Sequence, residues 1–438
     1  MSRQDGIKTL LVESHDHPYV TFNMVLRMGS LDDPPAPHGL AYLAGNMLLR
    51  GTAHRNRDAF VEAIDILGSS LHITVGKDYS TASSDVLVRH LPKLVALAAE
   101  SLVSFTCPPE ELAKLRRQTQ DELQLLRNHD DILAHHFAHR LLYDGHPYGN
   151  PIKGTAESLE RITRDDVITF LERHVCRRGL LVACAGDLTP SDLDETLETA
   201  FTALPNGNPE EVDFPAVRPL DGRTLLMIDK PERSQTQVVV CAPAITSSHP
   251  DYYPLMVANT IFGGTFTSRL SNEVREKRGW SYGAGSAFTP TMRTGSFWMR
   301  FAPENSHTAE SVQLGLEMLE DLVARGVSDD EIRFAQKSLV NYFPFKVDTA
   351  PKRLDQALYG MQLGWSPDWL DHYVAEVRAC GRERVERAIR AHLDPTRLVI
   401  AVLGTASEVA PGLEALPDLK RVHVHPYDEE WPPGQFER

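Results

Sequence analysis

The sequence predicts an α+β fold with two homologous domains, each a mixed, mostly antiparallel sheet backed by helices. Three observations predict it: the second half of the chain repeats the pattern of the first, each half opens with strand-like alternation, and a Pro- and Gly-rich segment separates the halves. A chain of 438 residues is long enough for two domains, since domains usually have about 100–200 residues.

The repeat begins with a short apolar segment in each half. Residues 9–12 (TLLV) and 224–227 (TLLM) start 215 residues apart, and an alternating segment follows each of them. Alternation with a period of two indicates strands with one buried face. The apolar positions are Val20, Phe22, Met24, Leu26 and Met28 in the first half, and Thr236, Val238, Val240 and Ala242 in the second. The HDHP segment at 15–18 predicts a hairpin turn between the first two strands.

Helices follow these strands in both halves. Small and apolar residues predict helices over 43–52 and 257–265, and each half then has two successive helices joined by a tight turn. In the second half Gly326 stands where a left-handed C-cap belongs, and Ser328 with Glu331 forms a capping box for the next helix. Glu111 is the corresponding residue of the first half, 220 positions earlier.

The segment between the halves is rich in Pro, Gly, Asn and Glu and has little helical or strand periodicity, which predicts a linker. We therefore predict an N-terminal domain at 1–205, a linker at 206–221 and a homologous C-terminal domain at 222–438. A repeat period of roughly 200 residues indicates a duplication and is too long for a solenoid.

Composition excludes some classes of function. The net charge of −15 disfavours a nucleic-acid binder, because proteins that follow phosphates carry a basic surface. The five cysteines are far apart and odd in number, which predicts reduced, buried thiols. No apolar run reaches the roughly 18 residues of a membrane span. We expect a cytoplasmic location; a periplasmic one would require that a signal peptide had been removed.

Residues 38–52 (HGLAYLAGNMLLRGT) keep the surrounding residues of a metal-binding motif but lack the residues that would bind the metal. The segment resembles the HxxEH zinc motif of the pitrilysin/insulinase/mitochondrial-processing-peptidase family, in which two histidines bind Zn²⁺ and the glutamate acts on a metal-bound water. Tyr42 and Asn46 stand at the histidine positions, and Gly45 stands at the glutamate position. Tyrosine and a neutral amide are not usual zinc ligands, and glycine has no side chain that could take a proton.

The third zinc ligand of this family is a glutamate on a later helix, and Glu122 stands at the matching place, 76 residues after Asn46. A lone carboxylate makes a poor zinc site, so a solvated residue on a charged helix is the alternative interpretation of Glu122. The resemblance therefore implies a degenerate motif with no metal and no other cofactor in this chain, and it places the zinc in a partner subunit.

Residues 263–283 resemble the second signature of the family, which includes Arg275 and, seven positions later, Tyr282. In the family this pair reaches the zinc site and holds the substrate. An arginine donates to peptide carbonyls in a planar fork, and a phenol can donate to the oxyanion that forms when water attacks a carbonyl. The resemblance implies that Arg275 and Tyr282 act in trans, and that the fold is half of a clam-shell chamber.

We therefore expect a non-catalytic, substrate-binding subunit of a heterodimeric zinc metallopeptidase, inactive when alone. Its partner would be a homologous subunit that carries HxxEH, and its substrate a peptide or a small unfolded protein. An inactive scaffold with no catalytic contribution is the alternative hypothesis.

A more remote alternative is a serine hydrolase, because residues 279–283 (GWSYG) match the pattern G-x-S-x-G with Ser281 as nucleophile. That motif requires a buried strand before the serine and a helix after it. Here the preceding residues are polar and helix-like, and the following ones are strand-like. We interpret His135, His136 and His139, which lie on one expected helix, as packing or surface residues. His423 and His425 alternate on an expected last strand, where a fortuitous nickel or zinc site is the alternative interpretation and no catalytic role is expected.

Overall fold

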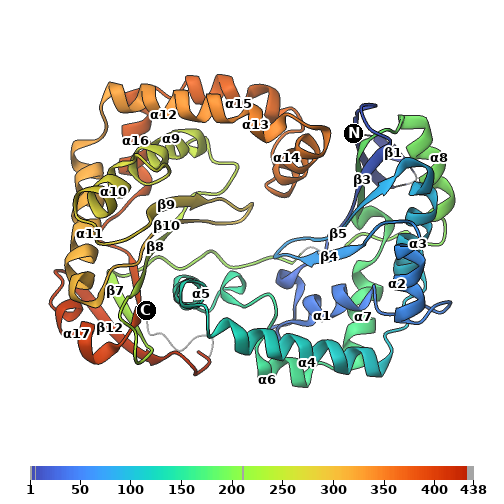
Figure 1. The fold of residues 1–438 in the computed structure, drawn as a ribbon, viewed down its shortest axis with the longest axis horizontal. Coiled ribbons are helices and arrows are strands. Elements are labelled where there is room, and N and C mark those ends of the chain that lie inside the picture. The colour runs from blue at the N-terminus through green and yellow to red at the C-terminus, as the bar shows by residue number, and fades with distance from the viewer. Residues whose placement is uncertain (1, 5, 210–211, 432–438) are drawn as a thin grey trace. The chain divides into compact units, whose positions relative to one another are not determined.

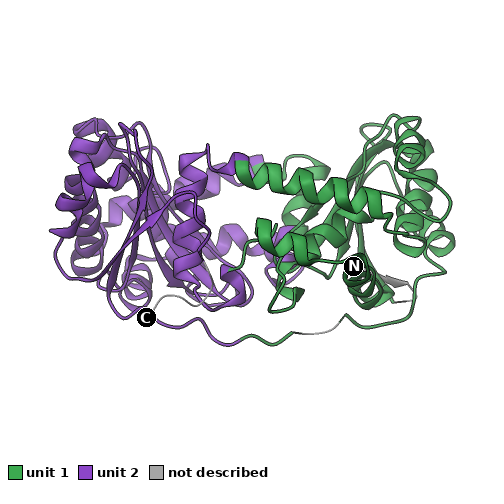
Figure 2. Cartoon of the chain, turned by 90° about the horizontal axis from the view of Figure 1, so that it is seen from below, with its two compact units in different colours: residues 1–124, 150–214, 346–358 green, residues 125–149, 215–345, 359–438 purple. Residues whose placement is uncertain are grey.

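The computed structural model describes residues 2–4, 6–209 and 212–431 of the chain, which form two compact units (Figure 2). Unit 1 comprises residues 1–124, 150–214 and 346–358, and unit 2 comprises residues 125–149, 215–345 and 359–438. Each unit holds one six-stranded sheet with helices against it, so the predicted fold class is confirmed (Figure 1).

The sheet of unit 1 has the strand order β1-β2-β6-β3-β5-β4. Its strands are β1 (Ser2–Gln4), β2 (Ile7–Glu13), β3 (Tyr19–Leu26), β4 (His72–Val75), β5 (Ser80–Leu87) and β6 (Leu180–Gly186). Strands β2 and β6 are parallel, and the other neighbours are antiparallel. The hairpin predicted at 15–18 is wrong, because β6 lies between β2 and β3 and pairs with both.

The helices of unit 1 cover this sheet and carry the first-half motif. They are α1 (Leu40–Met47), α2 (Arg57–Asp65), α3 (Leu91–Val103), α4 (Pro109–Leu126), α6 (Ala156–Arg161), α7 (Arg164–His174) and α8 (Pro190–Ala200), with short 3₁₀ turns η1 (Ser30–Asp32), η2 (Val88–His90) and η4 (Arg177–Gly179). The five apolar positions predicted on one face of β3 all lie in the core beneath these helices.

The sheet of unit 2 has the order β12-β7-β11-β8-β10-β9, which repeats the first sheet from its second strand onward. Its strands are β7 (Arg223–Asp229), β8 (Gln237–Ala244), β9 (Ala284–Thr289), β10 (Gly295–Phe301), β11 (Val399–Gly404) and β12 (Leu419–Pro426). The outer strands differ, since β12 runs parallel to β7 whereas β1 runs antiparallel to β2. The duplication read from the sequence is thus a duplication of five strands in each sheet.

Most helices of unit 2 come from the second half of the chain. They are α9 (Tyr252–Phe262), α10 (Arg269–Ser271), the π-helical turn η5 (Asn272–Lys277), α11 (Thr308–Arg325), α12 (Asp329–Tyr342), α13 (Pro344–Val347), α14 (Ala350–Gln362), α15 (Trp369–Arg378), α16 (Arg382–His392) and α17 (Ala406–Glu414), with the 3₁₀ turn η6 (Asn305–His307). The 3₁₀ turn η3 (Pro147–Gly149) of unit 2 comes from the first half. Helices α13 and α14 cross the boundary between the units. Gly326 after α11 has a positive φ of 72°, and the predicted capping box of Ser328 and Glu331 opens α12.

One helix of unit 2 comes from the first half of the chain. Helix α5 (Asp130–Leu142) packs against β8 and β11. On β8, Val238 and Val240 face the main core, and the alternate residue Cys241 lies 3.9 Å from the carbonyl oxygen of Ala138 on α5. The compact units are therefore discontinuous, whereas the sequence predicts contiguous domains separated at 206–221. Residues 210–211 of that linker lie outside the described residues.

All five cysteines are free and buried in the structure. Among the described helices, none is long and apolar enough to cross a membrane.

Candidate functional site

Helix α1 presents the three positions of the degenerate zinc motif. The helix starts at Gly39, where the buried carboxylate of Asp33 accepts hydrogen bonds from the backbone nitrogens of Gly39 and Ala41 at 2.7 and 2.6 Å. Burial raises the pKa of Asp33 to about 7. On the helix, Asn46 Nδ2 donates to the carbonyl oxygen of Tyr42 at 2.8 Å. The amide of Asn46 thus caps a backbone carbonyl within its own helix.

Gly45 lies on α1 next to Val75 of β4. A Cβ atom at this position would lie 2.7 Å from Cγ2 of Val75 on β4, closer than a real Cβ contact. The backbone here leaves no room for a glutamate side chain unless the helix or the strand moves. The packing of α1 against β4 therefore favours glycine at this position over a glutamate that could act as a general base.

Glu122 on α4 is paired with a lysine. Its Oε2 atom lies 2.6 Å from Nζ of Lys153, and the same Nζ lies 5.6 Å from the ring centre of Tyr42. The structure therefore joins two of the four predicted positions, Tyr42 and Glu122, through an ammonium group. Nothing in the sequence around Lys153 indicates this contact in advance.

These residues do not fit a zinc ion. Zinc requires three or four nitrogen, sulfur or carboxylate donors, and the motif positions provide one carboxylate, whose charge Lys153 already neutralises. Burial raises the pKa of Tyr42, so its phenol stays protonated and does not supply an anionic ligand. Tyr42, Gly45, Asn46 and Glu122 thus do not offer the donor set that a zinc ion requires.

A buried ion pair fixes the end of α1 to α4. Arg50 Nη1 lies 3.3 Å from Oε2 of the buried Glu111. In the second half, Nε of Arg269 donates to Oε1 of Glu331 at 2.6 Å and Nη2 donates to Oε2 at 2.8 Å. The pKa of Glu331 is lowered to about 2, mainly by its bond with Arg269. Arg269 therefore has a structural role in unit 2.

Arg275 lies on η5, the π-helical turn of unit 2. Its guanidinium carbon is 3.7 Å from the ring centre of Phe266 and 5.6 Å from that of Tyr282. Nη1 lies 3.3 Å from Glu276, an ion-pair distance, but it makes no hydrogen bond with any described residue. The guanidinium is thus held by the face of Phe266 and by the carboxylate of Glu276.

Tyr282 follows Arg275 after a turn at Gly279, whose φ is +66°. The Tyr282 side chain is 94% exposed, and Phe266 is 64% exposed. An exposed cation–aromatic cluster of Arg275, Phe266 and Tyr282 therefore stands on the surface of unit 2. The sequence predicts Arg275 and Tyr282 but misses Phe266, whose only signal is an aromatic residue in the polar segment 264–268.

Ser281, the nucleophile of the alternative hydrolase hypothesis, is buried and fully engaged. Its hydroxyl donates to the carbonyl oxygen of Gly283 at 2.7 Å and accepts from the nitrogen of Ala302 at 2.9 Å. These bonds hold the turn against the end of β10. They favour a structural role for this serine.

The remaining histidines of the sequence analysis pack against aromatic rings in unit 2. His135 stacks on Trp298 with ring centres 4.2 Å apart, and burial lowers the pKa of His135. His425 packs against Phe137 and Trp431. The contact of His135 agrees with its interpretation as a packing residue, and His425 also packs against aromatic rings.

Family models match both halves of the chain. The model described as Insulinase (Peptidase family M16) matches residues 8–156, and the model described as Peptidase M16 inactive domain matches residues 161–339. An uncharacterized zinc protease of Streptomyces coelicolor is 26% identical over 71% of this chain and 69% of its own length. The protein YmxG of Bacillus subtilis, also described as an uncharacterized zinc protease, is 20% identical over 88% of this chain and 93% of its own.

Solved structures show the same fold. A structure from Pseudomonas fluorescens, described as a peptidase M16 inactive domain, has a TM-score of 0.85 and 26% identity, and it covers 92% of this chain and 97% of its own. A protease from Helicobacter pylori has a TM-score of 0.84 at 15% identity, with 92% and 98% coverage. With family models on both halves and the fold shared over most of its length, the chain belongs to the insulinase family of peptidases, M16.

Proposed function

We propose that this chain is the non-catalytic, substrate-binding subunit of a heterodimeric zinc metallopeptidase. In this proposal a homologous partner with an intact HxxEH motif holds the zinc, and this chain supplies Arg275 and Tyr282 to the partner's active site. The substrate is a peptide or a small unfolded protein.

The first-half motif supports the absence of a metal centre in this subunit. Gly45 provides no base and no space for one, and Glu122 is committed to Lys153. Peptide hydrolysis by this family's chemistry needs a metal-bound water and a base beside it. A chain built in this way requires a second subunit for the chemical step.

The observation that carries the proposal is the cluster of Arg275, Phe266 and Tyr282. Arg275 stacks on Phe266, which fixes the direction of the guanidinium, and Nη1 makes no hydrogen bond within the described chain. Nη1 carries two N–H groups, and the ion pair with Glu276 at 3.3 Å leaves one of them to donate to a carbonyl oxygen of a ligand. The exposed phenol of Tyr282 provides a second donor beside it.

In the mechanism we infer, each residue has a simple task. The guanidinium of Arg275 donates to carbonyl oxygens of an extended peptide and orients it. The hydroxyl of Tyr282 donates to the oxygen of the scissile carbonyl, whose negative charge grows as water attacks. The zinc of the partner supplies the activated water.

The test combines this chain with an HxxEH-bearing relative from the same organism. We expect neither protein alone to cleave a library of fluorogenic peptides, and the mixture to cleave it. Removal of one oxyanion donor typically costs about 100–1,000-fold in kcat, which is the loss expected for Tyr282→Phe. Arg275→Ala should raise KM because it removes contacts that position the peptide.

Two matched variants control for nonspecific effects. Arg278→Ala removes an arginine of the same turn that is paired with Glu273, and Tyr342→Phe removes the hydroxyl of another exposed tyrosine; both should leave kcat and KM unchanged. Full activity of the mixture with Arg275→Ala and Tyr282→Phe would favour the scaffold hypothesis. Activity of the chain alone that is lost in Ser281→Ala would favour the serine hydrolase.

A further inference from the structure

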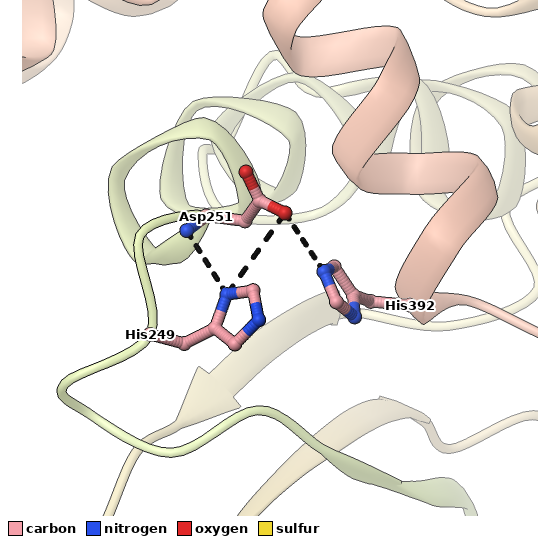
Figure 3. Close-up of side chains that lie close together, drawn as sticks. All are labelled: His249, Asp251 and His392. Carbon is pink, nitrogen blue, oxygen red and sulfur yellow. Dashed lines mark hydrogen bonds and ion pairs between the residues drawn. The ribbon is translucent and has the colours of Figure 1, made fainter.

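Three potential metal ligands meet in unit 2, away from the degenerate motif of unit 1. His249 and Asp251 stand just before α9, and His392 is the last residue of α16 (Figure 3). Asp251 Oδ2 lies 2.9 Å from Nε2 of His392 and 3.9 Å from Nδ1 of His249. One ligand atom from each residue lies within 4.8 Å of the others.

The fold holds the loop of His249 and Asp251 rigidly. Ser247 donates its hydroxyl to the carbonyl oxygen of Leu363 at 2.6 Å, and its own carbonyl accepts from Trp365 Nε1 at 2.9 Å. Arg384 on α16 donates to the carbonyl oxygen of Pro250 at 3.1 Å. The loop is thus anchored to α16 itself as well as to the segment after α14.

His392 is positioned by the packing of α16 on α9. Val385 and Ile389, on the inner side of α16, lie in the core of unit 2 with Val257 of α9. The helix ends at His392, so its imidazole stands beside the first turn of α9. All three donors therefore come from elements whose mutual positions the core determines.

We propose that His249, Asp251 and His392 form a binding site for a divalent transition-metal ion of the Zn²⁺ type. Two imidazoles and one carboxylate are a donor set that suits zinc, with ligand distances of about 2.0–2.2 Å. At these ligand distances one ion can bridge Asp251 Oδ2 and His392 Nε2, which are 2.9 Å apart, and Asp251 Oδ2 and His249 Nδ1, which are 3.9 Å apart. A small rotation of a histidine side chain brings both imidazoles, whose ligand atoms lie within 4.8 Å of each other, within reach of the same ion. Side chains that are 19–36% exposed leave an open position for water.

The ion would replace hydrogen bonds that the residues make among themselves. His392 Nε2 and Asp251 Oδ2 are hydrogen-bonded at 2.9 Å, and the backbone nitrogen of Asp251 donates to Nδ1 of His249 at 3.0 Å. Binding of the ion replaces both hydrogen bonds. We therefore expect an affinity in the micromolar range, weaker than that of closed four-ligand structural sites. The ion would clamp the start of α9 to the end of α16.

This proposal is independent of the proposed function, and its test uses the full chain without a histidine tag. After treatment with EDTA, titration calorimetry with ZnCl₂ should show one ion per chain, and Co²⁺ should give visible d–d absorption. Asp251→Asn keeps a residue that is favoured at a helix start but removes the carboxylate. His249→Gln and His392→Gln remove one imidazole each.

We expect each of these three variants to weaken Zn²⁺ binding by at least the roughly tenfold that loss of an outer-shell partner costs. Two controls should bind as the wild type does: His307→Gln, an exposed histidine paired with Glu310, and Glu122→Gln in unit 1. Thermal melts in EDTA separate misfolding from ligand loss, since a folded variant keeps the wild-type melting temperature and loses only its increase with Zn²⁺. No binding at 1:1 stoichiometry, or binding that survives in all three variants, would overturn the proposal, and loss of binding in Glu122→Gln would move the site to unit 1.

Discussion

The close packing around Gly45 shows that the fold favours a residue without a side chain at this position of the helix. In a helix interior, Gly→Ala normally stabilises by up to about 1 kcal/mol. At Gly45 the new Cβ would lie 2.7 Å from Val75 Cγ2, so we expect Gly45→Ala to destabilise unit 1 by about 1–3 kcal/mol through overpacking. Urea unfolding followed by far-UV circular dichroism measures the change.

A double-mutant cycle identifies the cause. In the background of Val75→Ala the clash is absent, so Gly45→Ala should be neutral or stabilising there. The same loss of stability in both backgrounds would mean that the helix is constrained by something other than this contact.

The candidate site residues could be named from the sequence, but the residues that contact them in space could not. Tyr42, Gly45, Asn46 and Glu122 could be named because the spacing of a motif survives the loss of its chemistry. The contact of Lys153 with Glu122 could not, since it joins a loop to a helix 31 positions earlier and no local pattern encodes it. His392 is 141 positions from Asp251, and their meeting likewise depends on helix packing alone.

At the scale of elements, each half of the chain uses an arginine–glutamate ion pair to fix a helix that follows its main strand. Arg50 pairs with Glu111 and Arg269 pairs with Glu331, and the two carboxylates belong to the first turns of α4 and α12. Glu331 also accepts from the backbone nitrogen of Ser328 at 2.8 Å in the capping box. The sequence predicted the box but not the arginine that shares its carboxylate.

This geometry makes a prediction about pH. Arg269→Ala should destabilise unit 2 by about 1 kcal/mol at pH 7, because it removes two charged hydrogen bonds to a carboxylate that is partly exposed to water. The folded pKa of Glu331, about 2, is below its usual value of 4.5, so this stabilisation is present above pH 4.5 and is lost as the pH falls toward 2.

The difference in unfolding free energy between wild type and Arg269→Ala should therefore shrink between pH 5 and pH 3. Arg333→Ala, which removes an exposed pair with Asp330 on the same helix, should change stability by less than about 0.5 kcal/mol at either pH. A difference for Arg269→Ala that stays constant with pH would contradict the assignment.

The strands show that the local sequence predicts where a strand lies but not which strands are its neighbours in the sheet. Alternation located β3 and β8, because the burial of one face of a strand is visible in the local sequence, and the repeat located the preceding strands β2 and β7. The neighbours of β2 were wrong, since β6 enters between β2 and β3 from 154 residues beyond β3, and only the complete sheet determines that order. Helix α1 was predicted to reach residue 52 but ends at Met47, because Thr52 pairs with Phe105 in a short bridge.

At the scale of the whole molecule, each half of the chain contributes a segment to the unit formed by the other. Residues 125–149 belong to unit 2, and residues 346–358, at a similar distance into the second half, belong to unit 1 (Figure 2). Nothing in the local sequence of α5 indicates that this helix covers the sheet of the other half. The two halves therefore cannot be treated as independent domains, although the repeat suggests that they could.

This exchange predicts that residues 222–438 do not form a stable domain when expressed alone. Helix α5 buries a set of apolar side chains on the outer face of this sheet: Leu133, Ala134, Phe137, Ala138, Leu141 and Leu142. Burying a large apolar side chain contributes about 1.5–3 kcal/mol, so the loss of α5 amounts to roughly 6–12 kcal/mol for its four large side chains, comparable with the total stability of a domain. The loss of Asp130 together with α5 would also leave the buried Lys230 without its carboxylate partner.

Limited proteolysis and near-UV circular dichroism of the fragment measure this outcome. The fragment should be degraded rapidly and lack fixed aromatic packing, and addition of a synthetic peptide of residues 125–149 should restore both, because it returns the helix that covers β8 and β11. A peptide with Phe137→Asp should fail, since it places a charge in the interface that Phe137 fills at 4% exposure. A fragment that is compact and protease-resistant without the peptide would show that α5 is an accessory to the second sheet, and the unit would then begin at the linker as the repeat alone suggests.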